Sequence, residues 1–239
     1  MIAAMPPEVL LIHGSAGDST TWSIQLASPV LRQRFSLIAY DRPILATVEE
    51  QAQVAAGRLA GPALIVGSSF GAVIALELVR THPELAAGAV LIEPPMGASD
   101  DTPAVAAAFL AEYDRRAAEQ GGPAAAEFFL RTVLGDAAFE RMPRAYRERS
   151  TAKHAEIRAD SAALLAYRPR YAELASVQTP VLLLGGERSA PFFRPTLEAL
   201  EAHLPHARLE IVAGAGHMVH AEASRRFAEL LTRFADEIG

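Results

Sequence analysis

Residues 64–78 have the sequence LIVGSSFGAVIALEL, in which a short apolar run leads into a glycine-bounded turn and then into a second apolar run. The turn fits the pattern G-x-S-x-G with Ser69 at its centre. A turn this sharp needs nearly bare residues two positions before and after the serine, and Gly67 and Gly71 supply them. The stretch therefore predicts a strand that feeds directly into a helix, with Ser69 at the carboxyl end of the strand and helical N–H groups directed at it. The plainer alternative is a glycine–serine turn without chemistry.

Further short apolar runs predict the rest of a sheet. They cover residues 8–14, 35–41, 89–93, 181–184 and 209–212. Helices are predicted at residues 24–31, 48–59, 72–80 and 223–238. Strand and helix alternating at this spacing predict an α/β protein with a mostly parallel, doubly wound sheet of about six strands. Ligands of such sheets bind beyond the carboxyl ends of the strands.

One segment interrupts this alternation, because residues 95–179 contain no strand pattern. Helical stretches are predicted there at residues 102–119, 124–134, 136–150 and 155–167. This is more than one crossover between neighbouring strands requires, so we predict an inserted helical cap rather than helices that pad the sheet. The predicted domains are an α/β core of residues 1–95 and 177–239 and a helical cap of residues 96–176.

Composition and charge exclude several classes of function. The net charge of −6 is spread along the chain without a basic cluster, which argues against nucleic acid as a partner. The absence of cysteine excludes disulfides, thiolate metal sites and cysteine nucleophiles. No apolar run is long enough to span a bilayer, and the first residues show no secretory signal, so we expect a soluble, cytoplasmic protein without a membrane partner. We expect no cofactor and no metal, and the oligomeric state is open between a monomer and a homodimer.

An activated serine needs a general base, and the base needs an orienting acid. His217 closes the sequence Gly214-Ala215-Gly216-His217, just after the last predicted strand. The flanking glycines allow this loop to bring an imidazole close to a neighbouring strand end. His217 is therefore the predicted base. His220 is its rival, and a loop histidine without a task is the plainer alternative.

Attack by a serine on a carbonyl group also creates an oxyanion, which needs two backbone N–H donors. One should come from Phe70, the residue after the nucleophile. The other should come from the loop after His13-Gly14, where Ser15 is the first candidate and Ala16 the second.

Taken together, these motifs resemble the α/β-hydrolase superfamily. The residues that carry the resemblance are His13-Gly14-Ser15, Trp22, Tyr40-Asp41-Arg42, Gly67-x-Ser69-x-Gly71 and Gly214-x-Gly216-His217, with the serine before the histidine as in that family. The resemblance covers the chain except the cap and implies a serine hydrolase without specifying a substrate. Only residues 1–7 precede the first predicted strand, so the hairpin that usually precedes it in the family is expected to be absent, which favours six strands over eight.

The chain departs from the family pattern at the acid. Most members carry it in a G-x-x-D turn after the penultimate strand, where this chain has Gly186-Glu187-Arg188-Ser189. A serine cannot hold an imidazolium by charge. Some members place the acid after the preceding strand instead, and there this chain has Glu93, whose burial at the end of an apolar strand is costly without a partner. Glu93 is therefore the predicted acid, Glu187 the alternative, and a chain without an acid the third possibility.

The predicted function is hydrolysis of a small-molecule carboxylic ester, or a thioester, through an acyl-enzyme on Ser69 with His217 as general base. Two alternatives stay open. The same residues could serve a carbon–carbon bond hydrolase, a lyase or a biosynthetic cyclase, or the chain could be an inactive hydrolase-like binding protein. Aromatic residues of the cap predict a partly apolar acyl or alcohol group in the substrate: Phe109, Phe128, Phe129, Phe139 and Tyr167.

Overall fold

The computed structural model describes residues 6–102 and 107–239, and its centre is one six-stranded sheet in which every strand pair is parallel. The strand order is β2-β1-β3-β4-β5-β6. The strands are β1 (Glu8–Ile12), β2 (Ser36–Ala39), β3 (Ala63–Ser68), β4 (Ala86–Ile92), β5 (Val181–Gly186) and β6 (Ala207–Val212). This confirms the predicted parallel sheet and its six strands.

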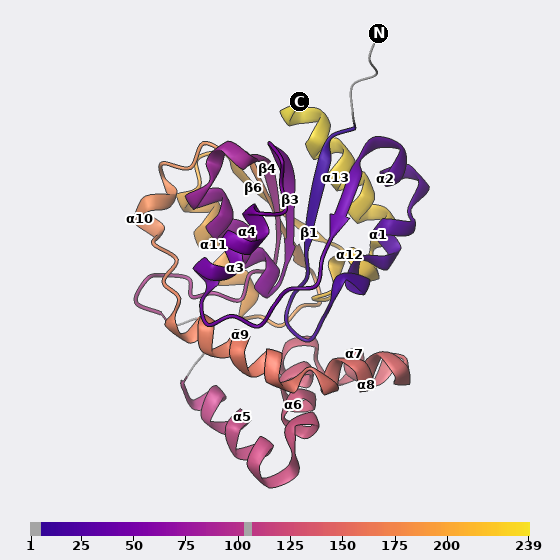
Figure 1. The fold of residues 1–239 in the computed structure, drawn as a ribbon, viewed down its shortest axis with the longest axis vertical. Coiled ribbons are helices and arrows are strands. Elements are labelled where there is room, and N and C mark those ends of the chain that lie inside the picture. The colour runs from indigo at the N-terminus through magenta and orange to yellow at the C-terminus, as the bar shows by residue number, and fades with distance from the viewer. Residues whose placement is uncertain (1–5, 103–106) are drawn as a thin grey trace.

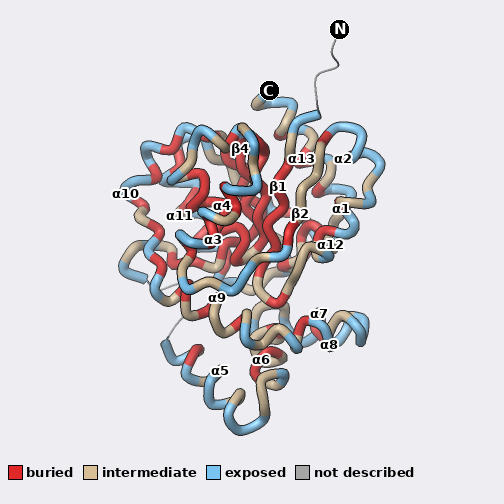
Figure 2. The backbone as a smooth tube through the Cα atoms, viewed as in Figure 1, coloured by how far each residue is buried: buried red, intermediate tan, exposed pale blue. Residues whose placement is uncertain are grey.

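Helices cover both faces of the sheet (Figure 1). One face carries α3 (Val48–Ala56), α4 (Phe70–Thr81), α10 (Tyr171–Leu174) and α11 (Phe193–His203). The other carries α1 (Ser23–Ala27), α2 (Pro29–Arg34), α12 (Val219–Glu222) and α13 (Ser224–Ile238). Alternate residues of one strand serve the two faces, since Leu10 and Ile12 join one apolar cluster and Val9 and Leu11 the other. Burial on both faces is why the inner strands β1, β3, β4 and β5 are nearly continuous apolar runs, whereas the less buried edge strand β6 carries Arg208 and Glu210. Figure 2 shows the buried backbone concentrated in the sheet.

Two predicted helices are broken at prolines. The helix expected at residues 24–31 is divided into α1 and α2, because Ser28 precedes Pro29 and takes an extended conformation. A 3₁₀ turn, Ser19–Trp22, precedes α1. Ser28 then caps α2 by accepting a hydrogen bond from the Leu31 N–H. The helix expected at residues 136–150 is divided in the same way into α7 (Asp136–Arg141) and α8 (Arg144–Ala152), because Met142 precedes Pro143 and takes an extended conformation. The helix α11 lies where the sequence analysis assigned no range.

The segment between β4 and β5 forms a group of helices at the end of the sheet where the strands terminate (Figure 1). They are α5 (Ala107–Gln120), α6 (Gly122–Leu134), α7 (Asp136–Arg141), α8 (Arg144–Ala152) and α9 (His154–Ala166). These helices have a small apolar cluster of their own, which includes Tyr113, Leu130 and Ile157. The last turns of α9 join the main core instead, through Ala163 and Leu164. Helix α9 therefore belongs to both clusters, and the division of the chain into core and cap remains our proposal.

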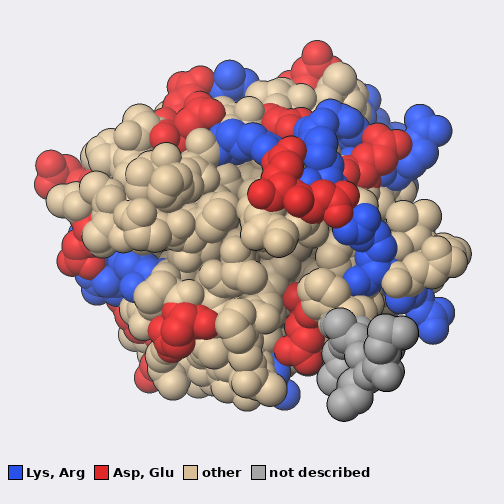
Figure 3. Space-filling view, turned by 90° about the horizontal axis from the view of Figure 1, so that it is seen from above, with Lys and Arg blue, Asp and Glu red and all other residues tan. Residues whose placement is uncertain are grey.

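Charges of both signs lie side by side on the face shown in Figure 3. Ion pairs are common among the charged side chains of the described residues, for example those of Arg226 and Arg233 with Glu210. None of the helices in the described ranges has the length and apolar character needed to cross a membrane.

Candidate active site

Ser69 stands between β3, which ends at Ser68, and α4, which begins at Phe70. Its backbone has φ 55° and ψ −125°, a conformation that costs a residue with a side chain on the order of 1–3 kcal/mol. Glycines on either side make this turn possible. A Cβ atom at Gly71 would collide with the backbone of Ile12, and one at Gly67 would collide with the carbonyl group of Gly71. The sequence therefore builds the strand–turn–helix that residues 64–78 predict.

His217 and Glu93 are brought together from opposite parts of the chain. The His217 Nδ1 lies 2.6 Å from one carboxylate oxygen of Glu93, and the other oxygen accepts a hydrogen bond from the Gly186 N–H at 2.7 Å. Both side chains are buried, with 4% and 1% of their surface exposed. A carboxylate at Nδ1 favours the tautomer that carries its proton there and leaves Nε2 free to accept one.

An aromatic ring covers one face of the His217 imidazole. The Phe193 ring lies parallel to it, with 4.3 Å between ring centroids and an angle of 12° between planes. Phe193 belongs to α11 and is itself buried. It fixes the orientation of the imidazole and separates one side of the ring from solvent. The sequence analysis did not single out Phe193, and nothing local in the sequence distinguishes it from a core residue.

The rival acid and the rival base lie elsewhere. Glu187 is exposed, and its carboxylate accepts a hydrogen bond from the Gly214 N–H at 2.8 Å. His220 is fully buried and packs on Trp22, with ring centroids 4.4 Å apart. Burial lowers the pKa of His220 to about 3, so its imidazole stays neutral. The Ser189 hydroxyl, at the position of the acid in most relatives, is buried and without a hydrogen-bond partner among the described residues.

A cavity of about 850 Å³ lies over this site, and both Ser69 and His217 line it. Its far wall comes from the helices between β4 and β5 and is largely apolar, with Phe129, Leu130 and Val133 among its residues. Of the aromatic residues predicted to line it, only Phe129 does so within the described ranges. Phe109 and Phe128 instead stack on each other, and the Tyr167 hydroxyl donates a hydrogen bond to Glu77.

Of the two predicted oxyanion donors, Ser15 lines this cavity, and Phe70 directly follows Ser69, which lines it too. Phe70 is the first residue of α4, so its N–H has no acceptor within the helix. The loop with Ser15 and Ala16 lines the cavity, and its Gly14 is so close to Ser69 that a Cβ atom at Gly14 would lie 2.9 Å from the Cβ of Ser69. The Ser15 hydroxyl is engaged elsewhere, since it donates a hydrogen bond to Asp160 at 2.7 Å. Asp160 was not singled out from the sequence, where it is one acid among many in a helical segment.

This arrangement can activate a serine and bind the negative charge that its attack creates. Among the described residues, no group of three or more His, Asp or Glu side chains is placed to hold a metal ion.

The chain is similar in sequence to known proteins. The sequence profile of a family described as "Alpha/beta hydrolase family" matches residues 9–230. A curated relative, the pimeloyl-[acyl-carrier protein] methyl ester esterase of Xanthomonas campestris pv. campestris, is 29% identical over 187 residues, which cover 76% of this chain and 74% of the relative.

Similar solved structures share the fold. An esterase from Thermogutta terrifontis superposes with a TM-score of 0.80 at 22% identity, over 97% of this chain and 90% of that one. The structure of MenH from S. aureus gives 0.80 at 16% identity, over 97% and 94%. The enol-lactonase from Burkholderia xenovorans LB400 gives 0.78 at 19% identity, over 99% and 94%.

Proposed function

The chain belongs to the alpha/beta hydrolase family, and from that premise we propose that it is a serine hydrolase that cleaves a carboxylic ester of a small molecule through an acyl-enzyme on Ser69. The observation that carries this proposal is the buried pair of His217 and Glu93 beside a cavity that Ser69 also lines. A histidine with an acid at Nδ1 is what a serine needs to become a nucleophile.

The proposed reaction runs in two halves. The Ser69 oxygen attacks the ester carbonyl while His217 Nε2 takes its proton, and the Phe70 and Ser15 N–H groups bind the oxyanion. The imidazolium then gives its proton to the leaving alcohol, which departs and leaves the acyl group on Ser69. Water attacks the acyl carbonyl by the same path, its proton passes through His217 to the Ser69 oxygen, and the acid is released. Glu93 holds the imidazole in the required tautomer throughout and stabilises its positive charge.

Esters are preferred over the other substrate classes on two grounds. The Xanthomonas relative is named for hydrolysis of a methyl ester. The apolar far wall of the cavity, with Phe129, Leu130 and Val133, suits an acyl chain or alcohol group without charge. A thioester fits the same site and is the second candidate. The serine at position 189 is the feature of the sequence that favours an inactive binding protein, and the Glu93 carboxylate at His217 counts against that alternative.

The test is the intact mass of the protein after exposure to a fluorophosphonate, for wild type and for Ser69→Ala, together with hydrolysis of short nitrophenyl esters. We expect a single adduct on wild type and none on the variant, and ester hydrolysis that is lost with the adduct. A folded wild-type protein that forms no adduct and hydrolyses no ester would refute the proposal.

A further inference from the structure

An ion pair is buried between the core and helix α9. The Arg42 guanidinium, from the segment after β2, lies 2.8 Å from the Asp160 carboxylate, and their side chains are only 4% and 5% exposed. Removing two such charges from water is costly unless further hydrogen bonds satisfy them. Where those additional bonds go therefore indicates what the pair does.

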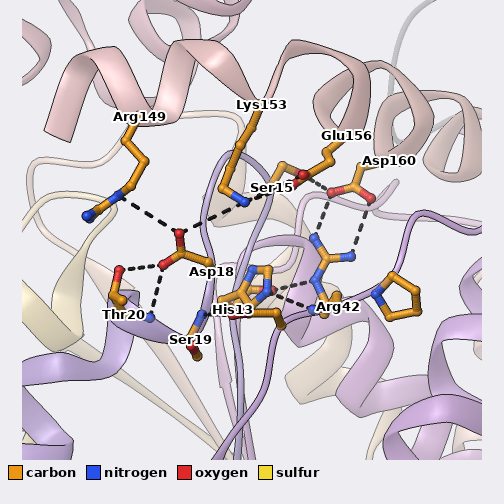
Figure 4. A network of polar contacts seen from close by, with 12 residues as sticks. His13, Ser15, Asp18, Ser19, Thr20, Arg42, Arg149, Lys153, Glu156 and Asp160 are labelled. Atoms are coloured by element: carbon orange, nitrogen blue, oxygen red, sulfur yellow. Dashed lines mark hydrogen bonds and ion pairs between the residues drawn. The ribbon is translucent and has the colours of Figure 1, made fainter. Parts of the chain in front are cut away.

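The bonds go to the loop that follows β1 (Figure 4). Asp160 accepts a hydrogen bond from the Ser15 hydroxyl at 2.7 Å. Arg42 donates from Nε to the His13 carbonyl at 3.1 Å and from Nη2 to the Gly14 carbonyl at 3.3 Å. A guanidinium presents its donors in a rigid planar fork, so it fixes these carbonyl groups relative to Asp160.

The imidazole of His13 holds the Gly14 carbonyl from a second direction. His13 Nε2 lies 3.2 Å from the backbone nitrogen of Arg42 and must accept a hydrogen bond from its N–H. The ring proton is therefore on Nδ1, which donates to the Gly14 carbonyl oxygen at 2.9 Å. Burial, with a contribution from the charge of Arg42, lowers the pKa of His13 to about 4 and keeps this neutral tautomer in place.

Fixing the Gly14 carbonyl also fixes the Ser15 N–H. The two groups belong to one planar trans peptide unit and point in opposite directions. The Gly14 oxygen is drawn toward Arg42 and His13, so the Ser15 N–H is turned away from them. Because Gly14 packs directly against Ser69, this peptide unit lies beside the nucleophile.

Arg42 also contacts the residue that carries the other proposed donor. Its guanidinium carbon lies 4.8 Å from the centre of the Phe70 ring. One side chain thus touches the ring of Phe70 and the carbonyl that orients the N–H of Ser15.

We propose that Arg42 and Asp160 are positioning residues for the oxyanion hole, and that the hole is complete only while α9 is seated on the core. Neither side chain touches the substrate. They act by holding the Gly14–Ser15 peptide unit in place. The oxyanion hole depends on α9 because Asp160, which belongs to that helix, is part of the network. The inference rests on the proposed serine hydrolase function and adds a structural condition to it.

Weaker contacts join the same partners further along the loop. The Asp18 carboxylate lies 3.9 Å from both Arg149 Nε on α8 and Lys153 Nζ just before α9 (Figure 4). These pairs are longer and more exposed than the Arg42–Asp160 pair, so they contribute less. They bring the end of α8 and the start of α9 to the loop that Asp160 holds through Ser15.

The test separates positioning from stability. A buried ion pair can often be replaced by apolar residues of similar volume without loss of stability, so the main variant is Arg42→Met combined with Asp160→Leu. Its kcat and KM for a nitrophenyl ester are measured below its melting temperature. Binding of a trifluoromethyl ketone, whose adduct with Ser69 carries an oxyanion, is measured in parallel. Asp114→Asn is the matched control, because it breaks an exposed Arg–Asp pair that Arg158, on the same helix α9, makes with Asp114 on α5.

We expect kcat to fall about 100-fold, at the lower end of the loss seen when an oxyanion donor is deleted. KM should stay within about threefold, because ground-state binding is untouched. Affinity for the ketone should fall in proportion to kcat, and the control should match wild type. If the double variant does not fold, Arg42→Lys is measured in its place and judged by the same criteria, because lysine keeps the positive charge but lacks the planar set of guanidinium donors.

A folded variant with wild-type kcat and ketone affinity would overturn the pair's role and leave the proposed function standing. A wild type that neither hydrolyses the ester nor reacts at Ser69 would overturn both.

Discussion

Replacing Glu93 by glutamine is the most direct test of its proposed role as the acid that orients His217, because each of its two carboxylate oxygens has a partner in the site. One faces the His217 Nδ1 at 2.6 Å and the other accepts the Gly186 N–H at 2.7 Å. A glutamine has one oxygen and one NH₂ group to place at these two positions. If the NH₂ group faced Gly186, two donors would meet in a buried site and a donor would be left unsatisfied, which costs about 1–3 kcal/mol. The glutamine therefore keeps its oxygen at Gly186 and turns its NH₂ group toward His217.

That orientation forces the imidazole of His217 into the opposite tautomer. A donor at Nδ1 requires Nδ1 to accept, so the ring proton moves to Nε2, which then cannot take the proton of Ser69. The charge that stabilised the imidazolium is lost as well. We expect kcat/KM for Glu93→Gln to fall about 10⁴-fold, the loss found for the same type of exchange in a serine protease triad. This corresponds to about 5.4 kcal/mol of transition-state stabilisation.

The assay is kcat/KM for a nitrophenyl ester, with circular dichroism to show that each variant is folded. Glu187→Gln is the matched control. Its carboxylate is exposed and accepts only from the Gly214 N–H in the described structure, so its exchange should leave kcat/KM within about twofold. The assignment is refuted if Glu93→Gln keeps wild-type activity while Glu187→Gln loses it.

Two further predictions concern stability. Burial lowers the pKa of His13 to about 4 and of His220 to about 3, whereas the unfolded chain takes up these protons near pH 6.5. The free energy of unfolding should therefore be highest above about pH 6.5 and fall as the pH drops below this value, by up to about 1.4 kcal/mol per pH unit for each histidine. Urea titrations at several pH values should show a shallower fall for His220→Phe, and an unchanged slope would contradict the reasoning. Gly67→Ala should prevent folding, because its Cβ would meet backbone atoms of the turn, whereas Gly61→Ala, with nothing within 4 Å, should express and melt like wild type.

The sheet could be predicted because its signals are local. The inner strands are nearly continuous apolar runs, and the turn around Ser69 needs glycines that are visible in the sequence. The breaks at Ser28 and Met142 also had a local signal, the proline that follows each residue. They were missed because the apolar pattern on both sides suits a single helix.

The partners of the site could not be predicted in the same way. Asp160 and Phe193 matter only through residues far away in sequence, namely Ser15 and Arg42 in one case and His217 in the other. An aspartate in a charged helix and a phenylalanine in an amphipathic one are ordinary at their own positions. Only the path of the chain around the sheet brings them into contact with these residues.

The position of the proposed acid, Glu93, follows from the same sheet. Strands β4 and β5 are parallel neighbours, so their carboxyl ends reach one edge together. The Glu93 N–H donates to the Leu184 carbonyl, and the Gly186 N–H donates back to the Glu93 carboxylate. An acid placed after β4 therefore arrives next to the turn after β5, where most relatives carry theirs. His217 therefore has a carboxylate partner although Ser189 stands where most members of the family have an aspartate. What places a carboxylate at His217 is the edge of the sheet at which it lies, not the strand that it follows in the sequence.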